Sequence, residues 1–330
     1  MPRNHRALLS VLLSLFITAC ATVPEKTNPP LVRQDNYSEH RIYNHQGMQL
    51  FVRRWEPQTA PHANVVILHG TSLHSGLYEP VAQRLTAAGY RVYAYDMQGW
   101  GRSGGKGSAG YVDSFYDYAD DLFVVINTLK QNYPGVPNFV MGESLGGAVA
   151  LYAALKDQNL CDGIITSAAG YKPNPKLLGI RAPGFITSFG MTMAQLGASV
   201  TPSMPVVESD TGIRMVVEDE AVEDQLLQDP YVAHGWLPAI YASTLADATD
   251  FIEPNLSQLD EPILLLHGER DMLVPLSSSR EIYNGVSSAS KTLRVYDSPH
   301  TVLLESARDQ AVGDVIEFLD KTTAQRVAAH

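Results

Sequence analysis

The fold is decided by the stretch Phe139-Val140-Met141-Gly142-Glu143-Ser144-Leu145-Gly146-Gly147-Ala148-Val149. Up to Glu143 it is short, apolar and contains aromatic and β-branched residues, which is typical of a buried strand. After Ser144 it continues with small and apolar residues that suit a helix. Ser144 therefore stands in a sharp turn between a strand and a helix, and Gly142 and Gly146 let the chain bend there.

Apolar runs of the same kind lie on both sides of this stretch, and helical patterns alternate with them. Besides Phe139–Glu143, the predicted buried parallel strands are Val65–His69, Val92–Asp96, Ile164–Ala168, Ile263–His267 and Thr292–Tyr296. The predicted helices are Tyr78–Ala88, Phe115–Gln131, Ala148–Leu155 and Gln310–Leu319. This alternation predicts an α/β fold with a mostly parallel central sheet and helices on both faces. Met48–Trp55 is expected to add antiparallel strands at one edge.

The alternation breaks between about residues 171 and 236. Apolar residues in this segment follow no strand period, and they include Leu177, Leu178, Phe185, Ile186, Phe189 and Met191. Because the strand predicted from Ile263 resumes the pattern, we interpret the segment as a cap inserted into one domain that covers residues 37–330. At 330 residues with 45% hydrophobic side chains, the chain can bury one substantial core of this kind.

The N-terminus predicts export from the cytoplasm. Arg3 and Arg6 precede an apolar stretch from Ala7 to Ala19. That stretch is shorter than the roughly 20 residues that span a bilayer. We therefore interpret residues 1–19 as a signal peptide and not as a transmembrane helix.

The end of this segment, Ile17-Thr18-Ala19-Cys20, resembles the lipobox of bacterial lipoproteins. The resemblance implies a lipid attached to Cys20, a tether over residues 20–36 and anchoring to a membrane of the bacterial envelope. Ala21 after the cysteine, in place of aspartate, favours the periplasmic face of the outer membrane. An ordinary secretory signal that is cleaved nearby is the alternative, and it too predicts export.

Charge and cysteine content narrow the possible partners. The formal net charge at pH 7 is −11, and it would be −13 without the segment that carries Arg3 and Arg6. Phosphate backbones are bound by clustered positive charge, so no nucleic-acid partner is expected. A lipid-modified Cys20 could not pair with Cys161, which we expect to be a small buried residue without a disulfide. No metal-binding spacing is present, and no cofactor is expected.

Two further residues complete a catalytic constellation with Ser144. Asp271 and His300 follow the last two predicted strands, which gives the chain order serine, acid, histidine of the α/β-hydrolase fold. Serine is a weak nucleophile at its ordinary pKa, so His300 is predicted to take its proton as general base. Asp271 is predicted to hold the imidazole in the correct tautomer and to stabilise its protonated form.

Other residues compete for two of these roles. The rival acids are Asp96, Glu269 and Asp260, and the rival histidines are His69, His267 and His74. Asp96 precedes the serine in the chain, and Glu269 lies two residues nearer its strand than Asp271, so both fit the pattern less well. The two histidines at strand ends are predicted to be structural, hydrogen-bonded beneath the loops that follow them, and His74 is expected at the surface.

An oxyanion hole is predicted from backbone groups. The tetrahedral intermediate of ester cleavage carries a negative oxygen, which needs two N–H donors. The first donor is predicted at Leu145, directly after the nucleophile at a helix N-terminus. The second is predicted at Thr71, in the loop after His69-Gly70, where the glycine lets the backbone turn.

From about Arg41 to its end, the chain resembles the monoacylglycerol lipase and lysophospholipase branch of the α/β-hydrolases, of the serine aminopeptidase S33 type. The resemblance rests on the Ser144 turn and on the motifs His69-Gly70-Thr71-Ser72-Leu73-His74-Ser75, Asp96-Met97-Gln98-Gly99-Trp100-Gly101-Arg102-Ser103 and His267-Gly268-Glu269-Arg270-Asp271-Met272-Leu273-Val274-Pro275. The chain departs from this branch at Trp100 and Glu143, where histidine is usual or frequent, and its cap is only weakly similar.

The resemblance implies hydrolysis of a single-chain acyl ester lipid, above all monoacylglycerol, through an acyl-Ser144 intermediate. A lysophospholipase is the near alternative. A serine aminopeptidase is more distant: its amine could be bound by the acidic run Glu218-Asp219-Glu220-Ala221-Val222-Glu223-Asp224, although such runs are more often solvated helix faces. A non-catalytic envelope lipoprotein is the third class, and the complete triad argues against it.

Overall fold

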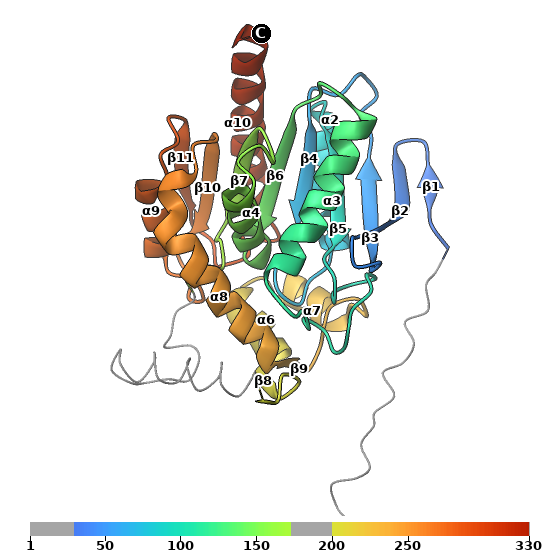
Figure 1. The fold of residues 1–330 in the computed structure, drawn as a ribbon, viewed down its shortest axis with the longest axis vertical. Coiled ribbons are helices and arrows are strands. Elements are labelled where there is room, and N and C mark those ends of the chain that lie inside the picture. Colours follow the sequence, from blue (N-terminus) through green and yellow to red (C-terminus); the bar gives the residue numbers. More distant parts are fainter. Residues whose placement is uncertain (1–29, 173–199, 330) are drawn as a thin grey trace, which may run out of the picture. The chain divides into compact units, whose positions relative to one another are not determined.

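The computed structural model describes residues 30–172 and 200–329. All of these residues except Pro30 belong to one compact unit that starts at Leu31, and its described part contains a nine-stranded sheet of order β1-β2-β3-β5-β4-β6-β7-β10-β11 (Figure 1). The strands are β1 (Arg33–Gln34), β2 (Tyr37–Tyr43), β3 (Gln49–Trp55), β4 (Asn64–Leu68), β5 (Arg91–Asp96), β6 (Asn138–Glu143), β7 (Gly163–Ser167), β10 (Ile263–Gly268) and β11 (Lys291–Tyr296).

The six strands predicted as parallel are confirmed, with ends that differ by one residue at most. Five of them are buried throughout, as predicted, but β11 is mostly half-buried or exposed because it lies at the edge of the sheet. From β5 through β4, β6, β7 and β10 to β11, every neighbouring pair is parallel. The predicted antiparallel edge is also confirmed, because β3 pairs antiparallel with both β2 and β5. The sequence therefore located the central sheet closely.

The outer edge of the sheet differs from the prediction. The tether was expected to extend to residue 36, yet Arg33 and Gln34 form β1 and pair antiparallel with Ser38 and Tyr37. Both β1 residues are exposed. Because this strand is held by backbone pairing and buries no side chain, it leaves no apolar period in the sequence.

Helices connect the strands. They are η1 (Ser75–Tyr78), α2 (Glu79–Ala87), α3 (Tyr116–Asn132), α4 (Leu145–Lys156), α8 (Ala239–Asn255), η2 (Leu256–Gln258), α9 (Leu276–Gly285) and α10 (Arg308–Ala329). The four predicted helices are confirmed as α2, α3, α4 and α10, although α4 begins three residues earlier and α10 is longer. Helices α8 and α9 were not predicted, because α8 contains Pro254 and α9 opens with three serines after Leu276.

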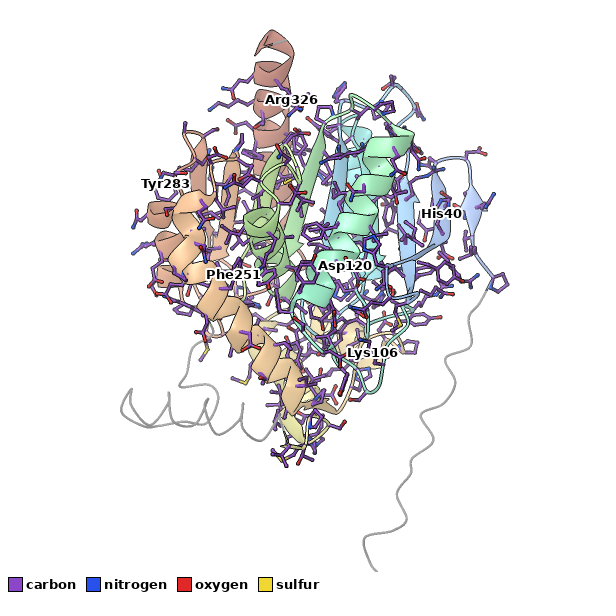
Figure 2. The ribbon with its side chains drawn as sticks, viewed as in Figure 1. His40, Lys106, Asp120, Phe251, Tyr283 and Arg326 are labelled. Atoms are coloured by element: carbon purple, nitrogen blue, oxygen red, sulfur yellow. The ribbon has the colours of Figure 1, made fainter. Side chains whose placement is uncertain are left out.

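Side chains of the central strands alternate between two apolar layers. In β4, Val66 points into one layer and Val65 into the other, and both are fully buried. Helices α3, α4 and α8 cover the first layer, and α2 and α10 cover the second (Figure 1). Phe251 of α8 lies against Tyr152 of α4, with ring centroids 4.8 Å apart (Figure 2). Burial on both faces explains the continuous apolar runs of the strands.

The described part of the interrupting segment forms elements outside the large sheet. These are β8 (Pro205–Glu208), α6 (Ser209–Val216), α7 (Glu220–Gln228) and β9 (Trp236–Pro238), and β8 pairs antiparallel with β9. The six apolar residues from Leu177 to Met191 lie outside the described residues, as do the predicted signal peptide and Cys20. The interpretation of residues 171–236 as a cap stays a prediction. Within the described ranges, no helix has the length and apolar character needed to cross a membrane.

Candidate active site

Ser144 lies in the turn between β6 and α4. Its backbone has φ 51° and ψ −114°, a left-handed conformation that non-glycine residues rarely adopt. Hydrogen bonds hold the residue on both sides: its N–H donates to the carbonyl oxygen of Ser167 at 2.8 Å, and its carbonyl oxygen accepts from the N–H of Gly170 at 2.8 Å. Such strain costs about 1–3 kcal/mol and persists only where the surroundings enforce it.

Gly142 and Gly146 flank this turn because neither position has room for a side chain. A Cβ atom at Gly142 would lie less than 3.0 Å from the carbonyl oxygen of Gly146, and one at Gly146 would come equally close to the carbonyl oxygen of Leu68. Neither glycine has a positive φ angle. Close packing of backbone against backbone, more than freedom to bend, therefore requires these two glycines.

Asp271 and His300 are hydrogen-bonded to each other. Asp271 Oδ2 lies 2.7 Å from His300 Nδ1, and neither side chain is more than 3% exposed. The other carboxylate oxygen, Oδ1, accepts from the backbone N–H groups of Leu273 at 2.8 Å and Val274 at 2.9 Å. Since an ionised carboxylate only accepts hydrogen bonds, Nδ1 of the neutral imidazole carries the hydrogen and Nε2 is left as a base.

His300 Nε2 is buried and has no hydrogen-bond partner among the described residues. The Ser144 hydroxyl, which is predicted to be that partner, is therefore not hydrogen-bonded to it in this structure. Catalytic hydrogen bonds are often long or poorly aligned before substrate binds. In the structure the predicted acid, Asp271, is therefore hydrogen-bonded to the predicted base, His300. The hydrogen bond between His300 and Ser144 is expected to form when substrate binds.

The loops that carry Asp271 and His300 touch through their backbones at Gly268, which the sequence analysis did not single out. A Cβ atom there would lie less than 3.0 Å from the carbonyl oxygens of Pro299 and Ser298. The N–H of Arg270 also donates to the carbonyl oxygen of Ser298 at 3.1 Å. A glycine at the end of a strand is common, so the sequence held no signal for this contact.

The predicted oxyanion loop lies beside the nucleophile. A Cβ atom at Gly70 would be 3.5 Å from Ser144 Cβ, and the N–H of Gly146 donates to the carbonyl oxygen of His69 at 3.1 Å. Thr71 Oγ1 is 2.5 Å from the hydroxyl of Tyr241 on α8. Leu145, the predicted first donor, is the first residue of α4. The use of the Thr71 and Leu145 N–H groups as oxyanion donors stays a prediction.

The rival histidines have partners outside the Asp271–His300 pair, although His267 Nε2 also lies 3.5 Å from Asp271 Oδ2. His69 Nε2 accepts from the N–H of Met97 at 3.0 Å, and burial lowers the pKa of His69 to about 4. His267 contacts Ser279 Oγ at 2.7 Å and the carbonyl oxygen of Val274 at 3.0 Å. The structural interpretation of both is confirmed.

The expectation that His74 lies at the surface is wrong. This residue is 4% exposed, and its Nε2 lies 3.0 Å from Asp229 Oδ2. Asp229 follows α7, so the element that covers His74 comes from a part of the chain 155 residues away. A histidine in a loop after a strand gives no hint of such a distant cover.

The rival acids are occupied or exposed. Asp96 is fully buried and accepts from the N–H groups of Ser75 at 2.8 Å and Arg102 at 2.7 Å. Burial by itself would raise the pKa of Asp96, but the nearby Arg53 guanidinium and other partners lower it overall. Glu269 and Asp260 are both exposed. Asp271 is thus the acid that meets His300.

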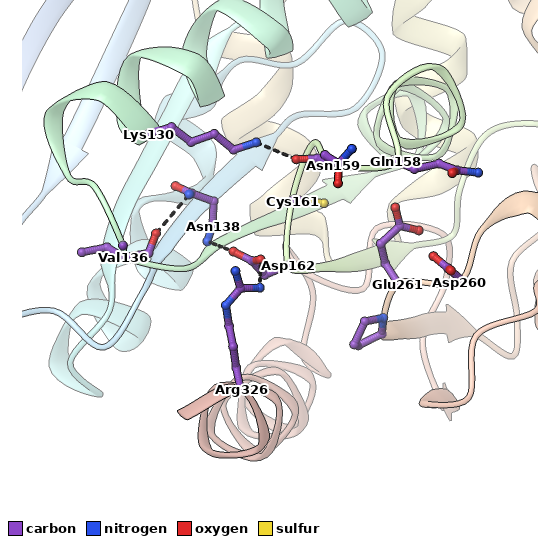
Figure 3. Close-up of a pocket in the computed structure, with 12 residues that line it drawn as sticks. Lys130, Val136, Asn138, Gln158, Asn159, Cys161, Asp162, Asp260, Glu261 and Arg326 are labelled. Carbon is purple, nitrogen blue, oxygen red and sulfur yellow. Dashed lines mark hydrogen bonds and ion pairs between the residues drawn. The ribbon is translucent and has the colours of Figure 1, made fainter. Parts of the chain in front are cut away.

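A cavity of about 540 Å³ lies at the other end of the sheet from Ser144, at the amino ends of β6, β7 and β10 (Figure 3). Cys161 lines it, and burial raises the pKa of this thiol to about 12, which fits the predicted inert residue. Glu261 lines it too, and within the described part of the chain its carboxylate oxygens are buried without a hydrogen-bond partner. Triad chemistry does not involve this cavity.

A strained serine between strand and helix, with an acid and a histidine after the last two strands of a mostly parallel sheet, defines a serine hydrolase of the α/β-hydrolase fold. Residues 59–307 match the family described as serine aminopeptidase, S33. The chain belongs to that family, and the predicted resemblance is confirmed.

Individual relatives agree with this family assignment. The chain is 29% identical over 283 residues to a monoacylglycerol lipase of Mycolicibacterium smegmatis, covering 86% of this chain and 96% of the relative. It is 26% identical over 308 residues to the monoglyceride lipase of Homo sapiens, covering 93% and 97%. Among solved structures, a soluble variant of the monoglyceride lipase of Saccharomyces cerevisiae in complex with a substrate analog shares the fold, with a TM-score of 0.76, 20% identity, and coverage of 89% and 98%.

Proposed function

We propose that the protein hydrolyses single-chain acyl esters, with monoacylglycerol as the preferred substrate. The observation that carries the proposal is the buried Asp271–His300 pair, whose unpartnered Nε2 lies on a loop that the Leu303 N–H ties to Glu143, the residue before the strained Ser144. The lipase names of the relatives from Mycolicibacterium smegmatis and Homo sapiens support an acyl-ester lipid as substrate.

The reaction follows from the groups present. Ser144 Oγ adds to the ester carbonyl carbon while its proton moves to His300 Nε2, and the carbonyl oxygen becomes an anion facing the N–H groups of Leu145 and Thr71. When this intermediate collapses, the bond to the glycerol oxygen breaks and that oxygen takes the proton from Nε2. Water then adds to the acyl carbon, giving a proton to Nε2, and collapse returns that proton to Oγ and releases the fatty acid.

The acidic run that motivated a peptidase has a structural account. Asp219 is the N-cap of α7 and accepts from the N–H of Ala221 at 2.8 Å, and Glu220 and Glu223 lie in the first turn, where negative charge is favourable. Glu218 accepts from Arg270 Nη2 at 2.6 Å. These contacts favour the ester reaction over amine binding. A lysophospholipase would differ from a monoacylglycerol lipase in its headgroup preference, and a comparison of substrates measures that preference.

Replacing Ser144 by alanine is expected to reduce fatty-acid release from monoacylglycerol by at least about 10⁴-fold, because no other group can form the acyl intermediate. The assay uses the full chain in detergent. It measures fatty-acid release from monoacylglycerol, lysophosphatidylcholine and diacylglycerol, and cleavage of an N-terminal proline peptide. A fluorophosphonate should label the wild type and not the Ser144→Ala variant. Ser277→Ala, at an exposed serine of α9, is the matched control and should retain full activity.

Each other outcome has a definite meaning. If lysophosphatidylcholine or the peptide were cleaved faster in a Ser144-dependent reaction, that compound and not monoacylglycerol would be the preferred substrate. A folded protein that neither cleaves an ester nor reacts with the fluorophosphonate would contradict the proposed function and support a non-catalytic lipoprotein.

We further propose that the protein is a lipoprotein anchored through Cys20 at the periplasmic face of the outer membrane. The support is the sequence Ile17-Thr18-Ala19-Cys20 after a basic and apolar segment. In a Gram-negative host fed a labelled fatty acid, Cys20→Ser should abolish labelling and move the protein out of the outer-membrane fraction. Cys161→Ser, the matched control at the other cysteine, should keep the label. Labelling that survives Cys20→Ser would contradict the anchor.

A further inference from the structure

Glu143 is the last residue of β6 and directly precedes the nucleophile. Its side chain is buried, with 1% of the residue exposed. In the branch that the chain resembles, histidine is frequent at this position. A carboxylate buried so deeply is costly unless hydrogen bonds satisfy its oxygens, so its partners indicate why the site holds one.

Both oxygens of Glu143 are occupied by donors from three separate segments. Oε1 accepts from the backbone N–H of Leu303 at 3.1 Å and from the hydroxyl of Ser167, at the end of β7, at 3.2 Å. Oε2 accepts from the hydroxyl of Tyr78, at the end of η1, at 2.8 Å. The Leu303 N–H can only donate, and the two hydroxyls donate here as well, an arrangement that suits the ionised carboxylate, which only accepts.

These partners belong to the catalytic loops. Leu303 lies three residues after His300, so its bond to Oε1 ties the histidine loop to the residue before the nucleophile. The Tyr78 hydroxyl in turn accepts from the N–H of Gly70 at 3.2 Å, next to the predicted oxyanion donor Thr71. Glu143 thus connects the histidine loop and the oxyanion loop to the nucleophile turn.

The charges around Glu143 favour a role beyond packing. The titratable groups that face it are Tyr78 from η1 and His300 from the loop after β11, with Asp271 on the far side of His300. Burial raises the pKa of Glu143 overall, although its hydrogen bonds and the attraction to His300 act in the opposite direction. This attraction is mutual, so an ionised Glu143 stabilises the protonated imidazole that forms during acyl transfer.

We propose that Glu143 is a positioning residue of the reaction: it holds the histidine and oxyanion loops against Ser144 and stabilises His300 when it carries the proton. The inference rests on the proposed ester hydrolysis. A purely structural glutamate would affect folding stability alone. The proposed role changes kcat and the pH dependence as well.

The test compares kcat, KM and the pH profile of kcat/KM for a soluble p-nitrophenyl butyrate substrate, using the full chain. Glu143→Gln should lower kcat by about 10- to 100-fold, by analogy with residues that orient the ligands of a catalytic metal, while KM stays within about 3-fold. The variant removes negative charge beside His300, so the imidazole loses its proton more readily. The acid limb of the profile should therefore move to lower pH, by about one unit.

Three further variants separate the parts of the role. Glu143→Asp keeps the charge and should leave the acid limb near its wild-type position. Tyr78→Phe cuts the connection to Gly70 but keeps the carboxylate, so it should lower kcat with little movement of the limb. Glu261→Gln removes another buried carboxyl group, at the opposite end of the sheet, and should change neither quantity.

An unchanged kcat and an unmoved acid limb in folded Glu143→Gln would overturn the inference. If that variant does not fold, wild-type kcat in both Glu143→Asp and Tyr78→Phe would overturn it instead. A wild-type protein without Ser144-dependent turnover of any ester overturns the proposed function and this inference together. Turnover of an ester other than monoacylglycerol overturns the substrate assignment alone.

Discussion

Asp271→Asn is expected to lower kcat for ester hydrolysis by about 10⁴-fold with little change in folding. The reason lies in the two N–H groups, from Leu273 and Val274, that point at Oδ1. They select the amide oxygen of an asparagine, so its NH₂ group must face His300 Nδ1. The imidazole then accepts at Nδ1 and carries its hydrogen on Nε2, where it can no longer take a proton from Ser144.

The measurement is kcat for the same soluble ester, together with the melting temperature. Glu269→Gln is the matched control, because it removes an exposed carboxylate two residues earlier, at one of the rival acids. This control should keep wild-type activity. A comparable loss in Glu269→Gln, or activity retained in Asp271→Asn, would show that the acid has been wrongly assigned.

Gly268→Ala is expected to destabilise the fold severely, by at least about 4 kcal/mol. The added methyl group would lie less than 3.0 Å from the carbonyl oxygens of Pro299 and Ser298, and neither a strand end nor a backbone carbonyl can move aside as a flexible side chain could. The two loops would have to separate, which would also break the contact of Asp271 with His300.

Urea unfolding of the variant measures this loss. Gly313→Ala provides the comparison, since it makes the same chemical change at an exposed position of α10 where a Cβ atom meets nothing within 4 Å. There alanine should stabilise the protein by up to about 1 kcal/mol, because it is the better helix former. Equal stability of the two variants would contradict the steric argument.

The central sheet and the pairing of Asp271 with His300 could be predicted because both follow from local patterns along the chain. Strands buried on both faces, such as Val65 to Leu68, appear as continuous apolar runs. The Ser144 turn was identifiable because its glycines, its strand and its helix are consecutive. The acid and the histidine then followed from their places after the last two strands.

What could not be predicted depends on contacts between distant segments. Gly268 is required by Pro299 and Ser298, and His74 is buried by Asp229. Glu143 was visible as a departure from its relatives, but its partners come from three separate places in the chain. Strand β1 is held by backbone pairing alone, and such pairing does not restrict which residue types occur.

The close approach at Gly268 has a consequence for how such a protein can diverge. The spacing of the two loops is set by main-chain atoms, which every amino acid shares, and by one position that must lack a side chain. Neighbouring residues can therefore be exchanged over evolutionary time while the acid and the base keep their separation.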